Sequence, residues 1–392
     1  MMKFARLLIC LILAAFVLAG CGKQPRKPQA MLDTPQHHVE VGLAKLDKGA
    51  PHQAQASFDT ALELDPEYGP ALAGKGIALA AIGDWDSARD YVDDGLGEAE
   101  GDGQELFANV AAIRAATWAA RNGELSGEDL LDDSEDAWNE GMELVEDNRE
   151  LDPAALNYYR GEACLQALNL DCSEAMFSRV ISATPANPQY AERAEARWRA
   201  VQMIRRAALK TSVGVRIALT EQITRADMAA LLVEELDIGR FYEKTAPAGS
   251  EYMDARTADP TATLEITDIA NHPLRADIEA VTSYGVRGLQ PFHGGLFKPD
   301  VPLSKAEGAM ILEDIIVRAS GDDSLATRYI GRESPFVDVR PDQPYFNAVM
   351  LVTTRGLLAT NARQGRFDPL APLSGAEAAL AVSALKTELN AW

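Results

Sequence analysis

The chain has 392 residues and a formal net charge of −22 at pH 7. Apolar residues make up 47% of it, which supports large packed cores and argues against wholesale disorder. A protein with this net negative charge repels nucleic acid and anionic lipid headgroups, so neither is expected as a partner. The length alone allows two or three domains.

The first twenty residues have the pattern of an export signal. Lys3 and Arg6 form a short basic region, and an uninterrupted apolar run extends from residue 7 to residue 20. A run of about 14 residues is too short for a helix to cross a bilayer core, which needs about 20 residues. Residues 1–20 are therefore expected to be a signal peptide.

The apolar run ends in Leu18-Ala19-Gly20-Cys21. Small residues directly before a cysteine resemble the lipobox of bacterial lipoproteins. The resemblance implies that the signal is cleaved before Cys21, which then carries the lipid and holds the protein at a membrane. The alternative is an ordinary signal peptide with a chance cysteine. Residues 21–36 contain three prolines and three cations and are expected to form a short extended tether.

Residues 37–210 are alanine-rich, with helical periodicity and short breaks. Gly42 and Ala54 are small enough to let two antiparallel helices approach closely, Phe58 can fill the gap to the next repeat, and Pro66 can end the second helix. These spacings resemble the 34-residue tetratricopeptide repeat. The resemblance implies a solenoid of helical hairpins that binds protein partners.

Further copies of this repeat are weaker. Their equivalent positions are Gly76, Ala88 and Val92 in one copy, and Gly161, Phe177 and Pro185 in another. Between them, residues 103–153 fit one repeat with lengthened helices, expected at 104–121 and 127–146. A helix at 190–209 is expected to close the stack. A plain helical bundle without repeat geometry is the alternative.

Most of the charge excess lies in residues 84–152, which hold 22 Asp and Glu against four Arg. One interpretation is a solvated outer face that keeps the solenoid soluble. The other is a docking surface for a basic segment of a partner. The segment lacks the Asp-x-Asp-x-Asp-Gly spacing that collects oxygen ligands around calcium, and no metal site is expected.

Two of the four cysteines lie in this helical half. Cys164 and Cys172 are eight residues apart across a predicted turn, a spacing that allows a disulfide between the helices of one hairpin. An exported protein meets conditions that permit such a bond. Two small buried thiols are the alternative.

The C-terminal part, residues 211–392, contains an internal repeat of 70 residues. The pattern Phe-x-Pro-x-x-Pro-Leu-Ser-x-Ala-Glu occurs at residues 297–307 and again at residues 367–377. Residues 266–269, which precede the first copy, match residues 336–339, which precede the second. A partial copy, Ile-Thr-Arg-Ala-Asp, occupies residues 223–227. The expected motifs span residues 211–239, 264–318 and 335–387.

Each copy places a hydroxyl residue before an apolar-periodic helix and a carboxylate three residues later. This spacing predicts a capping box, in which the hydroxyl accepts a first-turn N–H and the carboxylate accepts the N–H of the capping residue. The predicted pairs are Thr224 with Asp227, Ser304 with Glu307, and Ser374 with Glu377.

These motifs resemble the S-layer homology domain, whose motif commonly ends in Thr-Arg-Ala-Glu. The resemblance implies a pseudo-threefold, mostly helical unit that binds cell-wall polysaccharide or peptidoglycan through grooves between motifs. It also implies that the motif arginine contacts the ligand, since a guanidinium donates two parallel hydrogen bonds to a carboxylate or pyruvyl group.

The motif arginine is retained once. Arg225 keeps it, Lys305 replaces it in the second motif, and Gly375 replaces it in the third. Arg225 and Lys305 are therefore the candidate wall-ligand residues, and an arginine restored at position 375 is expected to strengthen binding. The alternative is a helical packing module that has lost sugar binding.

Known catalytic patterns are missing from the sequence. It contains no His-Glu-x-x-His zinc motif, no phosphate-cradling Gly-Lys-Ser/Thr loop and no Gly-x-Ser-x-Gly elbow. Its five histidines fall in the tether, in a repeat turn and in loops. The protein is therefore not expected to be an enzyme or to hold a cofactor.

Together these patterns predict a mostly α protein, with a tetratricopeptide-like solenoid followed by a pseudo-threefold S-layer homology unit. Its expected function is that of a non-catalytic scaffold lipoprotein of the cell envelope. Gly22 is not the Asp that retains many enterobacterial lipoproteins in the inner membrane, so the resemblance favours the outer membrane, facing the periplasm. The outer face of a plasma membrane is the alternative. The alternative function is a periplasmic assembly or secretion factor whose C-terminal unit is only structural.

Overall fold

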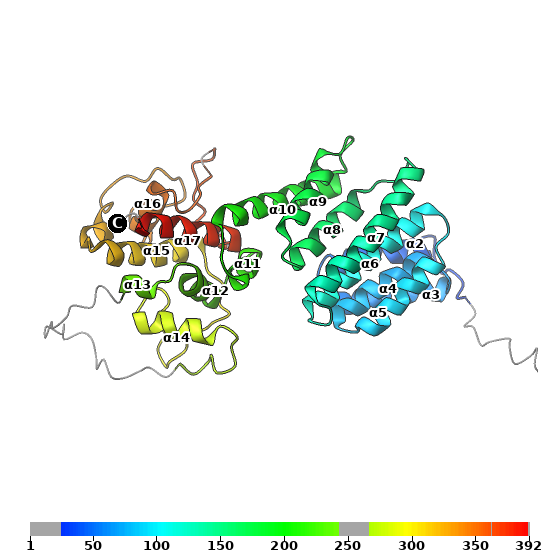
Figure 1. The fold of residues 1–392 in the computed structure, drawn as a ribbon, viewed down its shortest axis with the longest axis horizontal. Helices are drawn as coiled ribbons and strands as arrows, with labels where there is room; N and C mark the ends of the chain where they lie inside the picture. The colour runs from blue at the N-terminus through cyan, green and yellow to red at the C-terminus, as the bar shows by residue number, and fades with distance from the viewer. Residues whose placement is uncertain (1–24, 243–265, 362, 391–392) are drawn as a thin grey trace, which may run out of the picture. The chain divides into compact units, whose positions relative to one another are not determined.

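The computed structural model describes residues 25–242, 266–361 and 363–390. The signal peptide, Cys21 and the start of the tether lie outside the described residues. Every extended element of regular structure in the described part is helical, and β pairing is confined to isolated bridges (Figure 1). The prediction of a mostly helical fold is confirmed. Among the described residues, no helix combines the length and apolarity needed to span a membrane.

The chain forms two compact units that divide between Ala194 and Glu195. The division falls inside helix α10, whereas the predicted domain boundary at residue 210 lies just after that helix. We call the part before the division the N-terminal unit and the part after it the C-terminal unit, and each is described by itself.

The N-terminal unit is a stack of helical hairpins. Its helices are α2 (Pro35–Leu46), α3 (Pro51–Leu64), α4 (Gly69–Ile82), α5 (Trp85–Gly97), α6 (Asp102–Arg121), α7 (Gly127–Asp147), α8 (Ala154–Gln166) and α9 (Leu170–Ser182), followed by α10 (Pro188–Ala207), which contains the division. Successive helices pair as α2 with α3, α4 with α5, α6 with α7 and α8 with α9, and the first helices α4, α6 and α8 also pack on one another (Figure 1). The lengthened hairpin α6–α7 lies where the sequence predicts it.

Glycine opposite a large side chain sets the spacing of these hairpins. Phe58 in α3 is fully buried, and a Cβ atom on Gly42 in α2 would lie only 2.6 Å from its ring. The pair Gly161 and Phe177 repeats this arrangement between α8 and α9 at the same distance. The aromatic ring therefore occupies the space that the missing side chain leaves.

The C-terminal unit is built around three motif helices. Its elements are α11 (Ser212–Ala218), α12 (Arg225–Ala230) with its continuation η1 (Leu231–Glu235), α13 (Gly239–Tyr242), α14 (Arg275–Tyr284), α15 (Lys305–Ser320), η3 (Asp323–Thr327), α16 (Phe346–Thr354) and α17 (Gly375–Asn390). The shorter helices α14 and α16 are each followed by a glycine in the left-handed conformation, Gly285 and Gly356. One hydrophobic core, which includes the buried rings of Phe297 and Phe367, runs through all three motifs.

Candidate functional site

The main chains of the three motifs meet in a ring of hydrogen bonds. The N–H of Ile223 donates to the carbonyl of Leu373 over 3.0 Å. The N–H of Leu303 donates to the carbonyl of Ile223, and that of Leu373 to the carbonyl of Leu303, each over 2.9 Å. All three side chains are buried. Cyclic donation by three equivalent residues defines a pseudo-threefold axis, and the partial first motif supplies the third member.

A capping box follows each member of this ring. In the first box, the N–H of Asp227 donates to the Thr224 hydroxyl (3.2 Å) and the N–H of Thr224 donates to the Asp227 carboxylate (2.8 Å). The same two bonds pair Ser304 with Glu307 and Ser374 with Glu377. The predicted capping residues therefore start α12, α15 and α17, and each box contributes about 1 kcal/mol to its helix.

A half-buried aspartate holds the loop before the capped helix in each of the two complete motifs. The carboxylate of Asp268 accepts the N–H groups of Phe297 (2.8 Å) and Lys298 (2.7 Å). Lys298 has φ of 57°, a left-handed conformation that is unfavourable outside glycine, and these bonds fix it there. Sequence reasoning found the repeat match at Asp268 and assigned it no role.

The second aspartate acts in the same way. Asp338 accepts the N–H groups of Phe367 (3.1 Å) and Asp368 (2.8 Å), and Asp368 has φ of 58°. Burial raises the pKa of Asp338, but the donated hydrogen bonds and the nearby Arg366 outweigh burial and lower the pKa below its ordinary value. The carboxylate is therefore charged when it holds the loop.

The side chain of Arg225 binds the loop of the second motif. Its Nε donates to the carbonyl of Phe297 over 2.9 Å. Its two terminal nitrogens donate to the carbonyls of Gly288 (2.5 Å) and Gln290 (3.0 Å). The residue is only 6% exposed, and burial lowers the pKa of the guanidinium. All three nitrogens of Arg225 therefore hold loop carbonyls, and its role as a wall-ligand residue stays a prediction.

Lys305 occupies the equivalent place one motif later. It is 9% exposed, and its Nζ donates to the carbonyl of Ala359 over 3.2 Å. The same ammonium lies 3.4 Å from the carboxylate of Glu377, which also caps α17. Lys305 therefore also holds a loop, and its role as a wall-ligand residue stays a prediction.

Gly375 is required by its surroundings. Arg225 contacts the loop of the second motif and Lys305 that of the third, so the equivalent partner of residue 375 is the loop of the first motif. The first motif is the partial copy. The chain near Ile217 lies there instead, and the carbonyl oxygen of Ile217 occupies the place that a Cβ on Gly375 would take. The N–H of Gly375 donates to the carbonyl of Thr220 over 2.9 Å. The expectation that arginine at position 375 strengthens binding is therefore wrong on steric grounds.

An exposed aromatic ring lies beside Arg225. Phe292 is 46% exposed, and no other aromatic side chain of the described residues is a large exposed hydrophobic group. The guanidinium carbon of Arg225 lies 4.8 Å from the centre of its ring, and the Nζ of Lys298 lies 4.6 Å from it. Two cations therefore flank the ring, an arrangement stabilised by the negative charge on the ring face.

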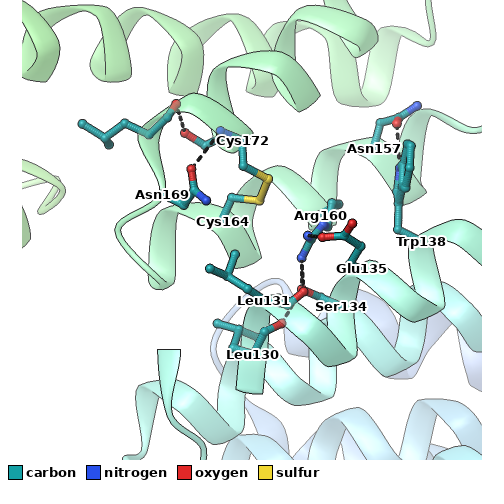
Figure 2. Close-up of a disulfide and its surroundings, with 12 residues drawn as sticks. Leu130, Leu131, Ser134, Glu135, Trp138, Asn157, Arg160, Cys164, Asn169 and Cys172 are labelled. Carbon is teal, nitrogen blue, oxygen red and sulfur yellow. Dashed lines mark hydrogen bonds and ion pairs between the residues drawn. A yellow bond between two sulfur atoms is a disulfide. The ribbon is translucent and has the colours of Figure 1, made fainter. Parts of the chain in front are cut away.

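In the N-terminal unit the two cysteines are joined. Cys164 in α8 and Cys172 in α9 form a disulfide with Cα atoms 5.8 Å apart, and the side chain of Asn169 caps the start of α9 (Figure 2). On the same α8, Arg160 is 4% exposed and points toward α7. It donates to the carbonyl of Leu131 and lies 3.0 Å from Glu135. These contacts fix α7 against α8.

The described residues give no sign of a metal centre. Throughout them, no group of three or more His, Cys, Asp and Glu side chains is placed to hold a metal ion.

The two units thus define a helical-repeat protein that ends in a pseudo-threefold capped module. Comparison with protein families identifies both parts. The tetratricopeptide repeat family matches residues 45–113, and the S-layer homology domain family matches residues 335–379. The chain therefore contains a tetratricopeptide-type repeat domain and a C-terminal S-layer homology domain, which confirms both resemblances.

Searches among curated proteins and among solved structures gave no significant match. The two family matches carry the functional assignment at a coarse level. The repeats point to protein binding, and the S-layer homology domain points to binding of a cell-wall polymer and to the cell envelope or surface.

Proposed function

We propose that the protein is a non-catalytic scaffold lipoprotein of the cell envelope. A lipid on Cys21 holds it in the outer membrane facing the periplasm, the repeats bind protein partners, and the C-terminal unit binds cell-wall polysaccharide or peptidoglycan. The observation that carries the proposal is the closed ring of three motifs. The ring is complete although the first motif is partial, so the architecture that forms inter-motif grooves is retained.

The surface where Arg225 of the first motif meets the loop of the second motif is the proposed wall site. Arg225 holds this loop, and the half-exposed ring of Phe292 lies close to Arg225 and Lys298. An aromatic face attracts the polarised C–H groups of a sugar ring, and Lys298 supplies a positive charge for an acidic substituent. In this proposal the aromatic ring of Phe292 and the ammonium of Lys298 contact the ligand, and Arg225 holds the loop that carries them.

Replacing Phe292 by alanine is expected to weaken binding to purified sacculi about fivefold to tenfold, because stacking on an aromatic ring contributes about 1 kcal/mol. The melting temperature is expected to stay within about 2 °C, since the ring is half exposed. Leu370→Ala is the matched control, because Leu370 is an exposed apolar residue of the third motif. Equal binding by Phe292→Ala and the parent would exclude this surface as the wall site.

Replacing Cys21 by alanine is expected to release the protein from the membrane fraction or to block its processing, because the lipid has no other attachment point in the proposal. Fractionation and the mass of the mature chain measure both results. Cys10→Ala removes the other cysteine of the first 21 residues and is expected to change neither. Normal cleavage and membrane retention of Cys21→Ala would contradict the lipoprotein assignment.

A second candidate is a periplasmic assembly or secretion factor. The observation that favours it is the use of Arg225 and Lys305 to hold loops, which is what a purely structural C-terminal unit requires. Sacculus pull-down of the lipid-free chain and crosslinking in cells separate the two candidates. Binding to sacculi supports the scaffold, whereas one dominant protein partner without sacculus binding supports the assembly factor.

A further inference from the structure

A groove of about 320 Å³ runs along the N-terminal unit between α5 and α7. Both helices pack on α6, which forms the floor (Figure 1). The floor is made of small side chains: Ala108, Ala112, Ala115 and Ala116. The volume lies at the lower end of the roughly 300–1,000 Å³ of ligand pockets, so the groove has room for one or two inserted side chains rather than for a large cofactor.

The walls of this groove are acidic. The four carboxylates that line it are Asp93 from α5 and Asp133, Asp136 and Glu140 from α7. Across the ranges that the structure describes, none of the four is in an ion pair, and Arg89 is the one cation that lines the groove. Burial raises the pKa of Asp133, and the charge of Asp129 raises it further. The charge of Arg89 lowers it in part, so negative charge is crowded here and only partly neutralised.

Apolar side chains line the groove beside the carboxylates. They include Trp85, Val92 and Leu96 from α5, and Leu96 is 37% exposed. Asn109 in α6 also lines the groove, and its side-chain nitrogen donates to the carbonyl of Glu105 over 3.2 Å.

We propose that the groove between α5 and α7 binds a basic segment of a partner protein, which inserts apolar side chains over the alanine floor while its Lys or Arg side chains pair with the acidic walls. Arg and Lys are pure donors, so they pair with the carboxylates. Apolar side chains of the segment cover the exposed surface of Leu96, which water otherwise contacts.

This inference rests on one part of the proposed function, which is that the repeats bind protein. It adds the chemistry of the partner and the place where it binds. Of the two interpretations of residues 84–152 it favours the docking surface, since a solvated outer face does not need an apolar groove between its helices. Sacculus binding tests the C-terminal unit separately, so the failure of one proposal leaves the other standing.

The test uses the lipid-free chain from residue 22 onward, which retains every described residue. The probe is a synthetic 14-residue peptide with Leu at helical i, i+3, i+4 spacing and Lys at the flanking positions. One control peptide has Ser for every Leu, and another has Glu for every Lys. Fluorescence anisotropy is expected to show at least tenfold tighter binding of the Lys–Leu peptide than of either control. Equal binding of the Lys–Leu and Lys–Ser peptides would overturn the proposal.

Two triple variants locate the site. Asp133→Asn, Asp136→Asn and Glu140→Gln together remove three wall charges, whereas Glu143→Gln, Glu146→Gln and Asp147→Asn remove three charges of α7 that do not line the groove. The net charge of the protein changes equally in both. The wall triple is expected to weaken binding about tenfold and the control triple less than twofold, because distant charges are screened. Equal weakening by the two would show attraction to the acidic surface in general and would overturn the site.

A third variant tests the floor. Ala112→Leu adds an apolar side chain inside the groove without changing charge, and leucine is a good helix former. It is expected to weaken binding of the Lys–Leu peptide at least fivefold and to leave the circular dichroism spectrum of the protein unchanged. Unchanged affinity in this variant would place the peptide elsewhere, even if the charge variants behaved as expected.

Discussion

Replacing Arg225 by alanine is expected to destabilise the C-terminal unit by about 3 kcal/mol, because three carbonyl oxygens lose a charged donor at a site that is 6% exposed. The loop that Arg225 holds is expected to open more readily than the rest of the unit. Hydrogen exchange of the full chain should show faster exchange across residues 288–301, the loop that the guanidinium holds. Arg225→Lys keeps the charge and loses the fork, so it is expected to lie between the parent and alanine.

The opposite outcome is equally informative. If Arg225→Ala leaves exchange in residues 288–301 and the unfolding midpoint unchanged while it abolishes sacculus binding, the residue is a ligand contact and its positioning role is wrong. If both stability and binding fall, Phe292→Ala separates them, since that substitution removes the exposed ring and leaves the three carbonyl bonds in place.

Features that depend on near neighbours in the chain were predictable. A capping box joins residues three apart, so Thr224 and Asp227 identify it without any knowledge of the fold. The repeat spacing likewise predicts that Phe58 fills the gap to the next repeat, and its ring lies 2.4 Å from the place that a Cβ on Gly74 in α4 would take. The lengthened helices α6 and α7 followed from the length of the segment between two recognisable copies.

The roles of the candidate wall-ligand residues were not predictable in this way. The carbonyl that accepts from the Arg225 Nε belongs to Phe297, 72 residues further along the chain. Local pattern does not reveal such a partner, and the resemblance supplied a ligand role in its place. One signal was available: residues 266–269 and 336–339 match, which marks Asp268 and Asp338 as structural, although only the left-handed loop at Lys298 shows why.

The acidic segment shows the same limit. Its composition is compatible with a solvated face and with a docking surface, and charge alone does not separate them. The groove between α5 and α7 over the small residues of α6 favours the docking surface that we propose above. Alanine at Ala112 and Ala116 reads as helix propensity in the sequence, whereas in the fold it determines the depth of that groove.

Replacing Gly375 even by alanine is expected to cost at least about 3 kcal/mol, and arginine there is expected to prevent folding of the C-terminal unit. The added Cβ would meet the carbonyl of Ile217, which is main chain and has no alternative rotamer. Relief of that clash would require a shift that also breaks the bond from Gly375 N–H to Thr220 and strains the ring of three motifs nearby.

Gly103→Ala is the matched control for Gly375→Ala, since Gly103 also lies in the first turn of a helix and has open space where its Cβ would be. It is expected to be neutral or slightly stabilising, because alanine restricts the unfolded chain. Thermal unfolding of both variants, together with hydrogen exchange across α11 and α17, measures the difference. A Gly375→Ala variant as stable as Gly103→Ala would show that Ile217 yields readily, and arginine at position 375 would again be a reasonable way to strengthen wall binding.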